Sequence, residues 1–153
     1  MRIKTFRHGS HPDDNKHRTK DKPIVELRPK QDMVYPLSQH IGAPAQAVVG
    51  VGDEVKMGQK IAQSSSFVSC NIFSSASGRV KAIEPRTTAM GETMQSIVIE
   101  NDGLFTPVEN LGVVTDAESL GKQDILAKIE ESGIVGLGGA GFPLHVKLKP
   151  KEP

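Results

Sequence analysis

The stretch Val51-Gly-Asp-Glu-Val-Lys-Met-Gly-Gln-Lys-Ile61 decides the fold, together with Ser74-Ser-Ala-Ser-Gly-Arg-Val-Lys-Ala-Ile83, which follows it along the chain. The two glycines of the first stretch permit tight turns, because glycine adopts backbone angles that other residues avoid. Val55 and Ile61 supply apolar side chains to an interior. The second stretch contains the glycine from which a new strand is expected to start. The two stretches therefore predict short strands that are joined by glycine turns.

Further short strands are predicted on both sides of these stretches. In the second stretch, alternation places Val80 and Ala82 on one side of the strand and Arg79 and Lys81 on the other. Prolines interrupt residues 23–49 and exclude a long helix there. The predicted strands are Gln46–Val51, Lys60–Gln63, Val68–Phe73, Gly78–Ile83 and Gln95–Glu100, with a hairpin turn at Met90–Glu92. Many short strands with glycine turns indicate a mainly β chain that forms a small barrel or sandwich.

The pairing of the two stretches resembles the biotinyl/lipoyl carrier family. The fold of that family is a barrel-sandwich hybrid, whose halves are related by a pseudo-twofold axis. Carriers attach their cofactor to a lysine at the tip of the hairpin between the halves. The corresponding span here, residues 62–77, contains no lysine, and a biotinyl or lipoyl amide needs a primary amine. We therefore expect the barrel to serve packing or docking and not covalent carriage.

Composition excludes several classes of function. The chain has 153 residues, with 19 Lys plus Arg against 18 Asp plus Glu, so no strong field attracts nucleic acid or an anionic membrane surface. The basic runs Lys16–Lys22 and Lys147–Lys151 are interpreted as solvated tails or linkers. No apolar run has the length of a signal-peptide core or of a membrane span. We expect a cytoplasmic protein without a span of its own.

Cysteine and histidine usage gives no metal site. Cys70 is the only cysteine, so the chain has no internal disulfide and does not by itself hold an iron–sulfur cluster, which needs about four ligands. We expect Cys70 to be an inert buried thiol. The histidines His8, His11 and His17 lie close together in sequence, but no carboxylate or cysteine pattern completes a site, and Pro12 breaks any helix that would align them.

The character of the chain changes near residue 104. A connector is expected at Phe105–Val114 and a helix from about Lys122 to Ser132, with Gly133 as its C-terminal cap. A short strand, Ile134–Val135, then leads into Gly136-Leu-Gly-Gly-Ala-Gly141, and a second helix is expected within Phe142–Leu148. The predicted division is a polar segment 1–22, a barrel 23–104, and a connector, helix and start of an α/β domain in 105–153. The polar tail at 149–153 is typical of a linker, so we expect a fragment of a longer protein.

The glycine-rich turn is a candidate phosphate site. Glycines 136, 138, 139 and 141 remove the Cβ atoms that would keep a ligand from the backbone. A helix that starts at Pro143 would present unpaired N–H groups to an anion. Lys147, about one helical turn further, would add a positive charge. Packing or simple chain reversal is the alternative explanation of such a turn.

The string Gly-Gly-Ala-Gly-Phe-Pro, followed by Lys147, resembles the flavin-binding motif of the NADH-oxidising subunit of respiratory complex I. The form in this chain, with His145-Val-Lys-Leu148 after it, is similar to the RnfC family of the Rnf electron-transport complexes. The resemblance extends over nearly the whole chain. It includes His11–Pro12, Lys20–Pro23, Pro36–Pro44, Val51–Val55, Gly58–Ile61 and Ser96–Gly103.

The resemblance implies a longer subunit, in which this barrel precedes an FMN- and NADH-binding α/β domain, a ubiquitin-like domain and a cysteine-rich segment with 4Fe–4S clusters. The family couples electron transfer between NADH and ferredoxin to ion movement across a membrane. By this analogy the cofactor-binding residues are Gly136, Gly138, Gly139, Gly141, Phe142 and Lys147, and none is catalytic. Leu144 departs from the threonine usual in the family, whose hydroxyl can bond phosphate.

Two interpretations of function follow. In the first, the chain is part of a redox subunit of an ion-translocating NADH:ferredoxin oxidoreductase, and it is inactive on its own. In the second, it is a non-catalytic docking module of that complex. The expected partners are NADH and the other subunits, at the cytoplasmic face of a bacterial inner membrane. His40 is either a hydrogen-bonded turn residue or part of a ligand or partner surface, and His145 is either a surface residue or a ligand contact.

Overall fold

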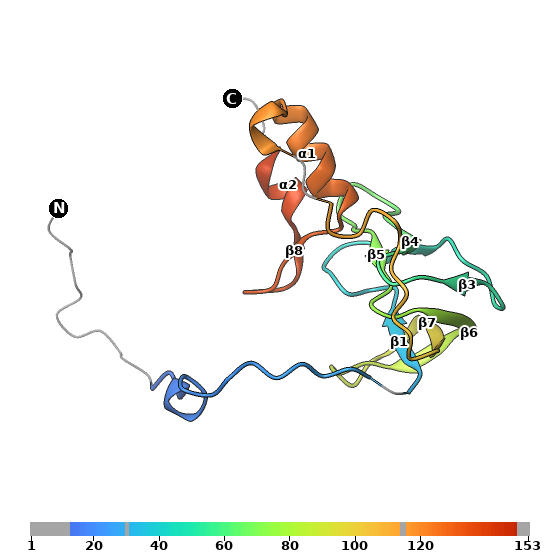
Figure 1. Ribbon diagram of the computed structural model, residues 1–153. Coiled ribbons are helices and arrows are strands. Elements are labelled where there is room, and N and C mark those ends of the chain that lie inside the picture. The colour runs from blue at the N-terminus through green and yellow to red at the C-terminus, as the bar shows by residue number, and fades with distance from the viewer. Residues whose placement is uncertain (1–12, 30, 114–115, 150–153) are drawn as a thin grey trace, which may run out of the picture.

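Two antiparallel sheets form the barrel in the computed structural model, which describes residues 13–29, 31–113 and 116–149 (Figure 1). One sheet has the strand order β1-β7-β6-β3 and the other has the order β2-β4-β5. The first sheet consists of β1 (Met33–Pro36), β7 (Thr93–Asn101), β6 (Gly78–Thr87) and β3 (Glu54–Val55). The second consists of β2 (Gln46–Ala47), β4 (Lys60–Gln63) and β5 (Ile72–Phe73). The prediction of a mainly β chain with a barrel-sandwich arrangement is confirmed.

The core lies between the two sheets and is built from aliphatic side chains. β7 is the central strand, and its Ile97 and Ile99 are completely buried. Tyr35 of β1 pairs with Ile97, and its hydroxyl lies 3.0 Å from the Ser75 hydroxyl. Val55 and Ile61, the predicted inward residues, are both buried in this cluster. Burial of each such aliphatic side chain stabilises the barrel by roughly 1.5–3 kcal/mol before the cost of conformational entropy.

A β-bulge changes one predicted face of β6. Val80 pairs with Ile99, but Ala82 pairs with Val98, and Ile83 pairs with Ile97, because the register shifts between Val80 and Ala82. Ile83 therefore joins Val80 on the core side, where it packs against the cluster. The prediction that Val80 and Ala82 share a face is wrong, because the bulge inserts one extra residue into the strand and reverses the alternation after it.

Two predicted strands are shorter than expected. Gln46–Val51 is paired only at Gln46–Ala47, and Val68–Phe73 only at Ile72–Phe73. The amides before β5 bond side chains instead of a neighbouring strand: Ser64 N–H donates to Asn71 Oδ1 and Cys70 N–H donates to His40 Nε2. Such local side-chain acceptors compete with strand pairing.

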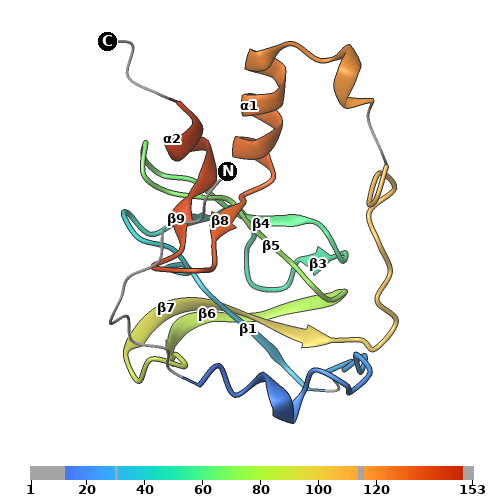
Figure 2. The ribbon, with the colours of Figure 1, turned by 90° about the vertical axis from the view of Figure 1, so that its left-hand side faces the viewer.

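A helical segment follows the barrel. After the 3₁₀ turn η2 (Ala117–Ser119), α1 (Lys122–Glu131) begins at the expected residue, and Gly133 behind it has a φ of +64°. Figures 1 and 2 show α1 and α2 (Leu144–Leu148) side by side. Between them, β8 (Val135–Gly136) and β9 (Phe142–Pro143) form a two-stranded hairpin. The second helix starts at Leu144 and not at Phe142, because Phe142 and Pro143 pair with Gly136 and Val135.

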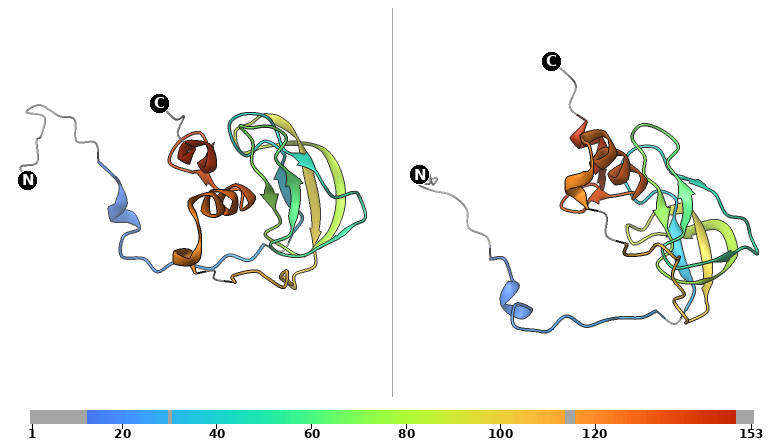
Figure 3. Two further views of the ribbon diagram at one scale, coloured as in Figure 1. Left: turned by 90° about the horizontal axis from the view of Figure 1, so that it is seen from above. Right: turned by 45° about the horizontal axis from the view of Figure 1, so that its top comes forward.

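Residues 13–29 lie outside the barrel. They contain the single turn η1 (Lys16–Arg18) and an extended stretch up to Pro29, whose carbonyl accepts a hydrogen bond from Asn101 Nδ2. In Figures 1 and 3 this stretch runs away from the barrel. Among the described residues, no helix has the length and hydropathy that a membrane crossing requires.

Candidate functional site

The glycine-rich stretch is the tip of the β8–β9 hairpin. Cβ atoms placed on Gly138 and Gly139 would meet nothing within 4 Å. Leu137, beside them, is 88% exposed. In Figure 1 this tip projects away from the barrel. The main chain at Gly138 and Gly139 is therefore open to a ligand, and side chains at these positions would occupy the space that a ligand needs.

Three of the predicted site residues meet at the base of the hairpin. The Lys147 ammonium lies 3.0 Å from the point where a Cβ on Gly136 would stand. The same ammonium lies 5.7 Å from the centre of the Phe142 ring. Within the described part of the chain, no carboxylate forms an ion pair with Lys147. The cation is thus held over a glycine, next to an aromatic ring, and is available to an anion.

Gly141, unlike Gly138 and Gly139, lies in close contact with another backbone segment. Its φ is +68°, and a Cβ there would come within 3.2 Å of the Gln39 carbonyl oxygen and 3.3 Å of His40 Cα. This glycine therefore lets the hairpin pack against the barrel loop, as the packing explanation of the motif requires. Leu144 N–H donates to the Ile134 carbonyl at 2.9 Å, so this amide does not face a ligand. Of the amides that were expected to be unpaired at the helix start, that of Leu144 is therefore already bonded.

Gly133 fixes the helical segment to the barrel. A Cβ on Gly133 would lie 2.3 Å from the Asn71 carbonyl oxygen. The Asn71 side chain donates to the Glu131 carbonyl at 2.9 Å, and Lys60 Nζ donates to Glu131 Oε1. We name this set of contacts among Lys60, Asn71, Glu131 and Gly133 the interlock. It positions α1, and through α1 the hairpin, relative to the barrel.

His40 is a hydrogen-bonded turn residue. It is buried, and its Nε2 accepts the Cys70 amide at 3.0 Å and lies 3.2 Å from the Ser69 hydroxyl. The Ala43 carbonyl oxygen lies 3.1 Å from the same nitrogen. Burial lowers the pKa of His40, against a smaller opposing effect of the Ala43 carbonyl. Cys70 is buried as predicted, and burial, aided by the Glu130 carboxylate, raises the pKa of its thiol.

His145 is buried, which corrects the expectation of a surface residue. Only 2% of it is exposed, its Nε2 lies 4.0 Å from Glu130 Oε1, and its Nδ1 has no hydrogen-bond partner among the described residues. The hydrogen bond from Lys149 lowers the pKa of Glu130, assisted by the nearby His145. His145 therefore lies on the side of α2 that faces α1 and is not a residue of the open hairpin tip.

A small cavity of about 210 Å³ lies in the seam between the barrel and the hairpin. Its lining joins residues that are distant in sequence, including His40, Cys70, Phe73 and Leu137. The sequence does not predict this seam, because the residues that line it follow neither a helix nor a strand periodicity. The cavity borders the hairpin tip and extends the candidate site toward the barrel.

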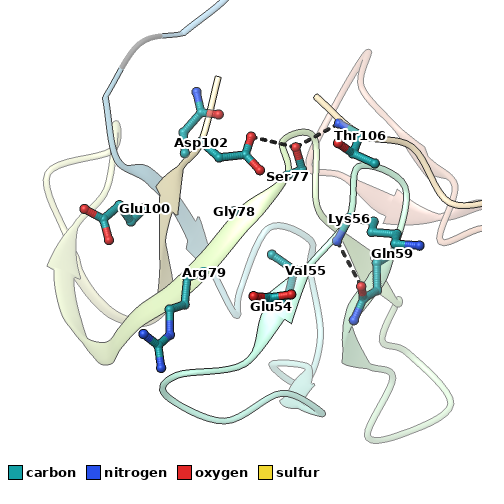
Figure 4. Close-up of a pocket in the computed structure, with 11 residues that line it drawn as sticks. Glu54, Val55, Lys56, Gln59, Ser77, Gly78, Arg79, Glu100, Asp102 and Thr106 are labelled. Atoms are coloured by element: carbon teal, nitrogen blue, oxygen red, sulfur yellow. Dashed lines mark hydrogen bonds between the residues drawn. The ribbon is translucent and has the colours of Figure 1, made fainter. Parts of the chain in front are cut away.

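A larger cavity, of about 680 Å³, lies on another part of the barrel, between β3, β6 and β7 (Figure 4). Its polar groups bond one another: the Ser77 hydroxyl donates to Asp102 Oδ1 and accepts the Thr106 amide, each at 2.8 Å. The Leu104 amide, followed by the Ser77 hydroxyl, lowers the pKa of Asp102. We conclude that these groups hold the connector on the barrel. Pro107 of the connector also forms a β-bridge with Met57.

Two further sequence predictions concern a covalently attached cofactor and a metal site. The hairpin between β4 and β5 ends in an exposed Phe67 and has no lysine for a carrier cofactor. His8 and His11 lie outside the described residues, and His17 is exposed in η1. Within the described ranges, no three His, Cys, Asp or Glu side chains come together as a metal site.

Known proteins match this arrangement. A family model described as the RnfC barrel sandwich hybrid domain matches residues 4–104. The C subunit of a proton-translocating ferredoxin:NAD(+) oxidoreductase complex from Clostridium ljungdahlii is 49% identical over 149 residues, which are 97% of this chain and 32% of the relative. The C subunit of a Na(+)-translocating complex of the same kind from Acetobacterium woodii is 40% identical over 144 residues, with 94% and 32% covered.

A third relative is the C subunit of an ion-translocating oxidoreductase complex from Vibrio cholerae, 36% identical over 149 residues, with 94% of this chain and 19% of the relative covered. The chain thus spans about a third of the length of the first two relatives. The family model covers the two sheets and the loops between them. In agreement with its sequence motifs, the chain belongs to the RnfC family.

Proposed function

We propose that this chain supplies the barrel and the first part of the flavin site to the NADH- and FMN-handling, iron–sulfur subunit of an ion-translocating ferredoxin:NAD oxidoreductase complex. In that complex, electron transfer is coupled to ion transport. The names of the relatives support membership of such a complex. The observation that carries the flavin assignment is the Lys147 ammonium over Gly136, beside the open Gly138 and Gly139.

The residues present fit the phosphate end of FMN. Gly138 and Gly139 leave the main chain accessible, and Lys147 has the charge that a phosphate dianion requires. Phe142 supplies an aromatic ring at the same place. In this proposal Gly136 makes room for the ammonium, and Gly141 holds the hairpin on the barrel. When bound, FMN supplies the carrier that links hydride transfer from NADH to single-electron steps.

The remaining cofactors are assigned to other parts of the subunit. One cysteine does not hold a 4Fe–4S cluster, and we place the clusters and the NADH site outside this chain. We set the boundary between barrel and flavin-site segment after Leu104, with residues 105–153 beginning the α/β domain. We further propose that the chain alone neither oxidises NADH nor retains FMN on gel filtration, and that it works at the cytoplasmic face of the membrane with the other subunits.

A docking module is the second candidate function. It is favoured by exposed apolar side chains at the hairpin end of the barrel: Phe67 is 65% exposed and Ile41 is 48% exposed. A surface of this kind suits contact with another protein domain. In this alternative, residues 134–148 complete the packing of the barrel and bind no flavin.

A charge substitution separates the two functions. The test protein is a chimera in which residues 1–149 replace the matching segment of the Clostridium ljungdahlii relative. We expect Lys147→Gln to raise the Kd for FMN about 5- to 30-fold, because a charge-assisted phosphate contact contributes roughly 1–2 kcal/mol at a partly exposed site. Lys122→Gln, at the first residue of α1, is the matched control and should leave the Kd unchanged. Equal FMN affinity of both variants, measured by quenching of flavin fluorescence, would favour the docking function.

A further inference from the structure

Residues 23–29, Pro-Ile-Val-Glu-Leu-Arg-Pro, form an extended segment that we name the strap. Its three large aliphatic side chains are almost fully exposed: Ile24 by 102%, Val25 by 81% and Leu27 by 89%. Together these side chains expose more apolar surface to water than those of a polar linker of the same length would. Exposed aliphatic residues that are adjacent in sequence indicate a contact surface for another molecule.

The main chain of the strap is also unpaired. Across the described ranges, no backbone or side-chain group bonds the amides or carbonyls of residues 23–28. Pro23 and Pro29 favour extended geometry at the residues before them, Lys22 and Arg28, and the five residues between the prolines are too few for a stable helix. The β-branched Ile24 and Val25 favour the same conformation. The strap therefore has the backbone of a strand without a neighbouring strand.

The strap is anchored at one end only. Its last carbonyl, that of Pro29, accepts Asn101 Nδ2 at 2.7 Å, and the Arg28 guanidinium lies 5.7 Å from the centre of the Phe105 ring. Glu26 pairs with Arg28 at 2.6 Å. Before this anchor the main chain runs away from the barrel (Figure 3), while Leu27 borders a cavity of about 570 Å³ that Met33 and Phe105 also line.

The residues in front of the strap carry an excess of positive charge. The described residues 13–22 contain four bases, Lys16, Arg18, Lys20 and Lys22, and three acids, Asp13, Asp14 and Asp21, and Lys16 pairs with Asp14 at 3.8 Å. The positive charges are thus concentrated next to the strap, in residues 16–22. All of them are exposed. A surface that receives the strap is therefore favoured when it carries acidic groups next to its apolar part.

We propose that the strap adds as an edge strand to a β-sheet of another subunit of the complex, with Ile24, Val25 and Leu27 in apolar pockets and the basic residues 16–22 against an acidic rim. Strand addition satisfies the unpaired amides and buries the aliphatic side chains in one step. The proposal rests on the proposed function only for the statement that the chain works in an assembly of several subunits. It does not depend on FMN.

A lipid surface would also suit the charged and apolar residues, but the backbone of the strap argues against this occupant. An interfacial segment binds lipid as an amphipathic helix, and the five residues between the two prolines are too few for one. An extended segment with unpaired amides loses the hydrogen bonds of water when it enters the hydrocarbon region. A sheet edge supplies those hydrogen bonds.

The test uses the assembled membrane complex that contains this chain. We expect the triple substitution Ile24→Ser, Val25→Ser, Leu27→Ser to reduce recovery of the subunit with the membrane subunits at least tenfold, roughly the effect of losing an apolar anchor cluster. Met90→Ser is the matched control, because Met90 is 86% exposed at the β6–β7 turn. The FMN content of the released subunit should be unchanged, which separates this result from a failure of the flavin assignment.

Backbone pairing is tested separately by proline. Amides of successive residues in a strand point to opposite sides, so either Val25→Pro or Glu26→Pro must remove an intermolecular hydrogen bond, whereas Glu26→Ala removes none. We also expect alternate amides within residues 24–28, those that face the partner strand, to exchange hydrogen at least tenfold more slowly in the complex than in the free chain. Full recovery of the triple variant, unchanged exchange, or equal recovery of both proline variants would overturn the proposal. Binding of the free chain to anionic phospholipid vesicles that the triple substitution abolishes would also overturn it.

Discussion

Gly133→Ala tests whether the interlock positions the helical segment on the barrel. The new Cβ would stand 2.3 Å from the Asn71 carbonyl oxygen, so the two backbones must separate by about 1 Å to reach ordinary contact. Three costs follow: about 1–2 kcal/mol for a non-glycine residue in the left-handed region, about 1–3 kcal/mol for overpacking, and about 1 kcal/mol for weakening the hydrogen bond from Asn71 to the Glu131 carbonyl. We expect a total loss of about 3–6 kcal/mol.

The matched control is Gly103→Ala. Gly103 has a φ of +74°, close to the +64° of Gly133, but a Cβ there would meet nothing within 4 Å. It therefore has only the backbone cost of about 1–2 kcal/mol. The difference between the variants, about 2 kcal/mol or more, isolates the contact with Asn71.

Urea unfolding followed by two probes measures this difference. Helical circular dichroism at 222 nm reports mainly on α1 and α2, while the fluorescence of Tyr35, the only tyrosine in a chain without tryptophan, reports on the barrel. Gly133→Ala should lose its helical signal about 1 M urea earlier than Gly103→Ala, given typical urea dependences, and before the tyrosine signal changes. Equal midpoints for the two variants would refute the role of the interlock.

Three other outcomes follow from the buried groups. Folding lowers the pKa of His40. The contribution of His40 to stability is therefore complete above the ordinary pKa of about 6.5, and it decreases as the pH falls below that value toward the lowered pKa. Thermal unfolding between pH 7.5 and 5.5 should show this decrease in stability; His40→Gln should make the decrease smaller, and His17→Gln, at an exposed position, should not. Cys70 should resist a thiol reagent at pH 8 in the folded chain and react rapidly in urea, because it is 1% exposed and its thiol pKa is raised; rapid labelling without urea would contradict its burial. Asn71→Ala should destabilise by roughly 1–3 kcal/mol, since it leaves the half-buried Ser64 amide and the Glu131 carbonyl without their partner, whereas Asn110→Ala, at an exposed position, should change little in the same unfolding assay.

The barrel was predictable because its signals are local. Gly52 and Gly58 have the positive φ that their turns require, and the Met90–Glu92 turn closes the β6–β7 hairpin as expected, with the Thr88 amide bonded to the Glu92 carbonyl. β4 occupies the predicted residues Lys60–Gln63. In each case a short pattern and a turn residue determine the outcome without help from distant parts of the chain.

The errors arose where distant contacts decide the structure. The bulge that brings Ile83 to the core depends on pairing with Ile97, and the sequence shows only that Ala82 and Ile83 are adjacent apolar residues. Pro143 is typical of the first residue of a helix, but its pairing with Val135 makes it part of a hairpin. The sequence around His145 has no apolar pattern that indicates burial. His145 is buried because α1, from another part of the sequence, packs over it.

The candidate site was only partly predictable for the same reason. The motif identified Gly136, Gly138, Gly139, Phe142 and Lys147, and their proximity follows from a hairpin of few residues. The role of Gly141 depends on Gln39 and His40, and that of Gly133 on Asn71. These contacts join segments that the sequence does not relate to one another, so only the folded structure reveals them.

A crystal structure of the chimera with bound FMN would decide whether the β8–β9 hairpin is part of a flavin site. We predict that the FMN phosphate lies at the tip of this hairpin, within hydrogen-bond distance of Lys147 Nζ and of main-chain amides at Gly138 or Gly139. FMN bound with its phosphate away from this hairpin, while residues 134–148 keep the geometry described above, would contradict the assignment.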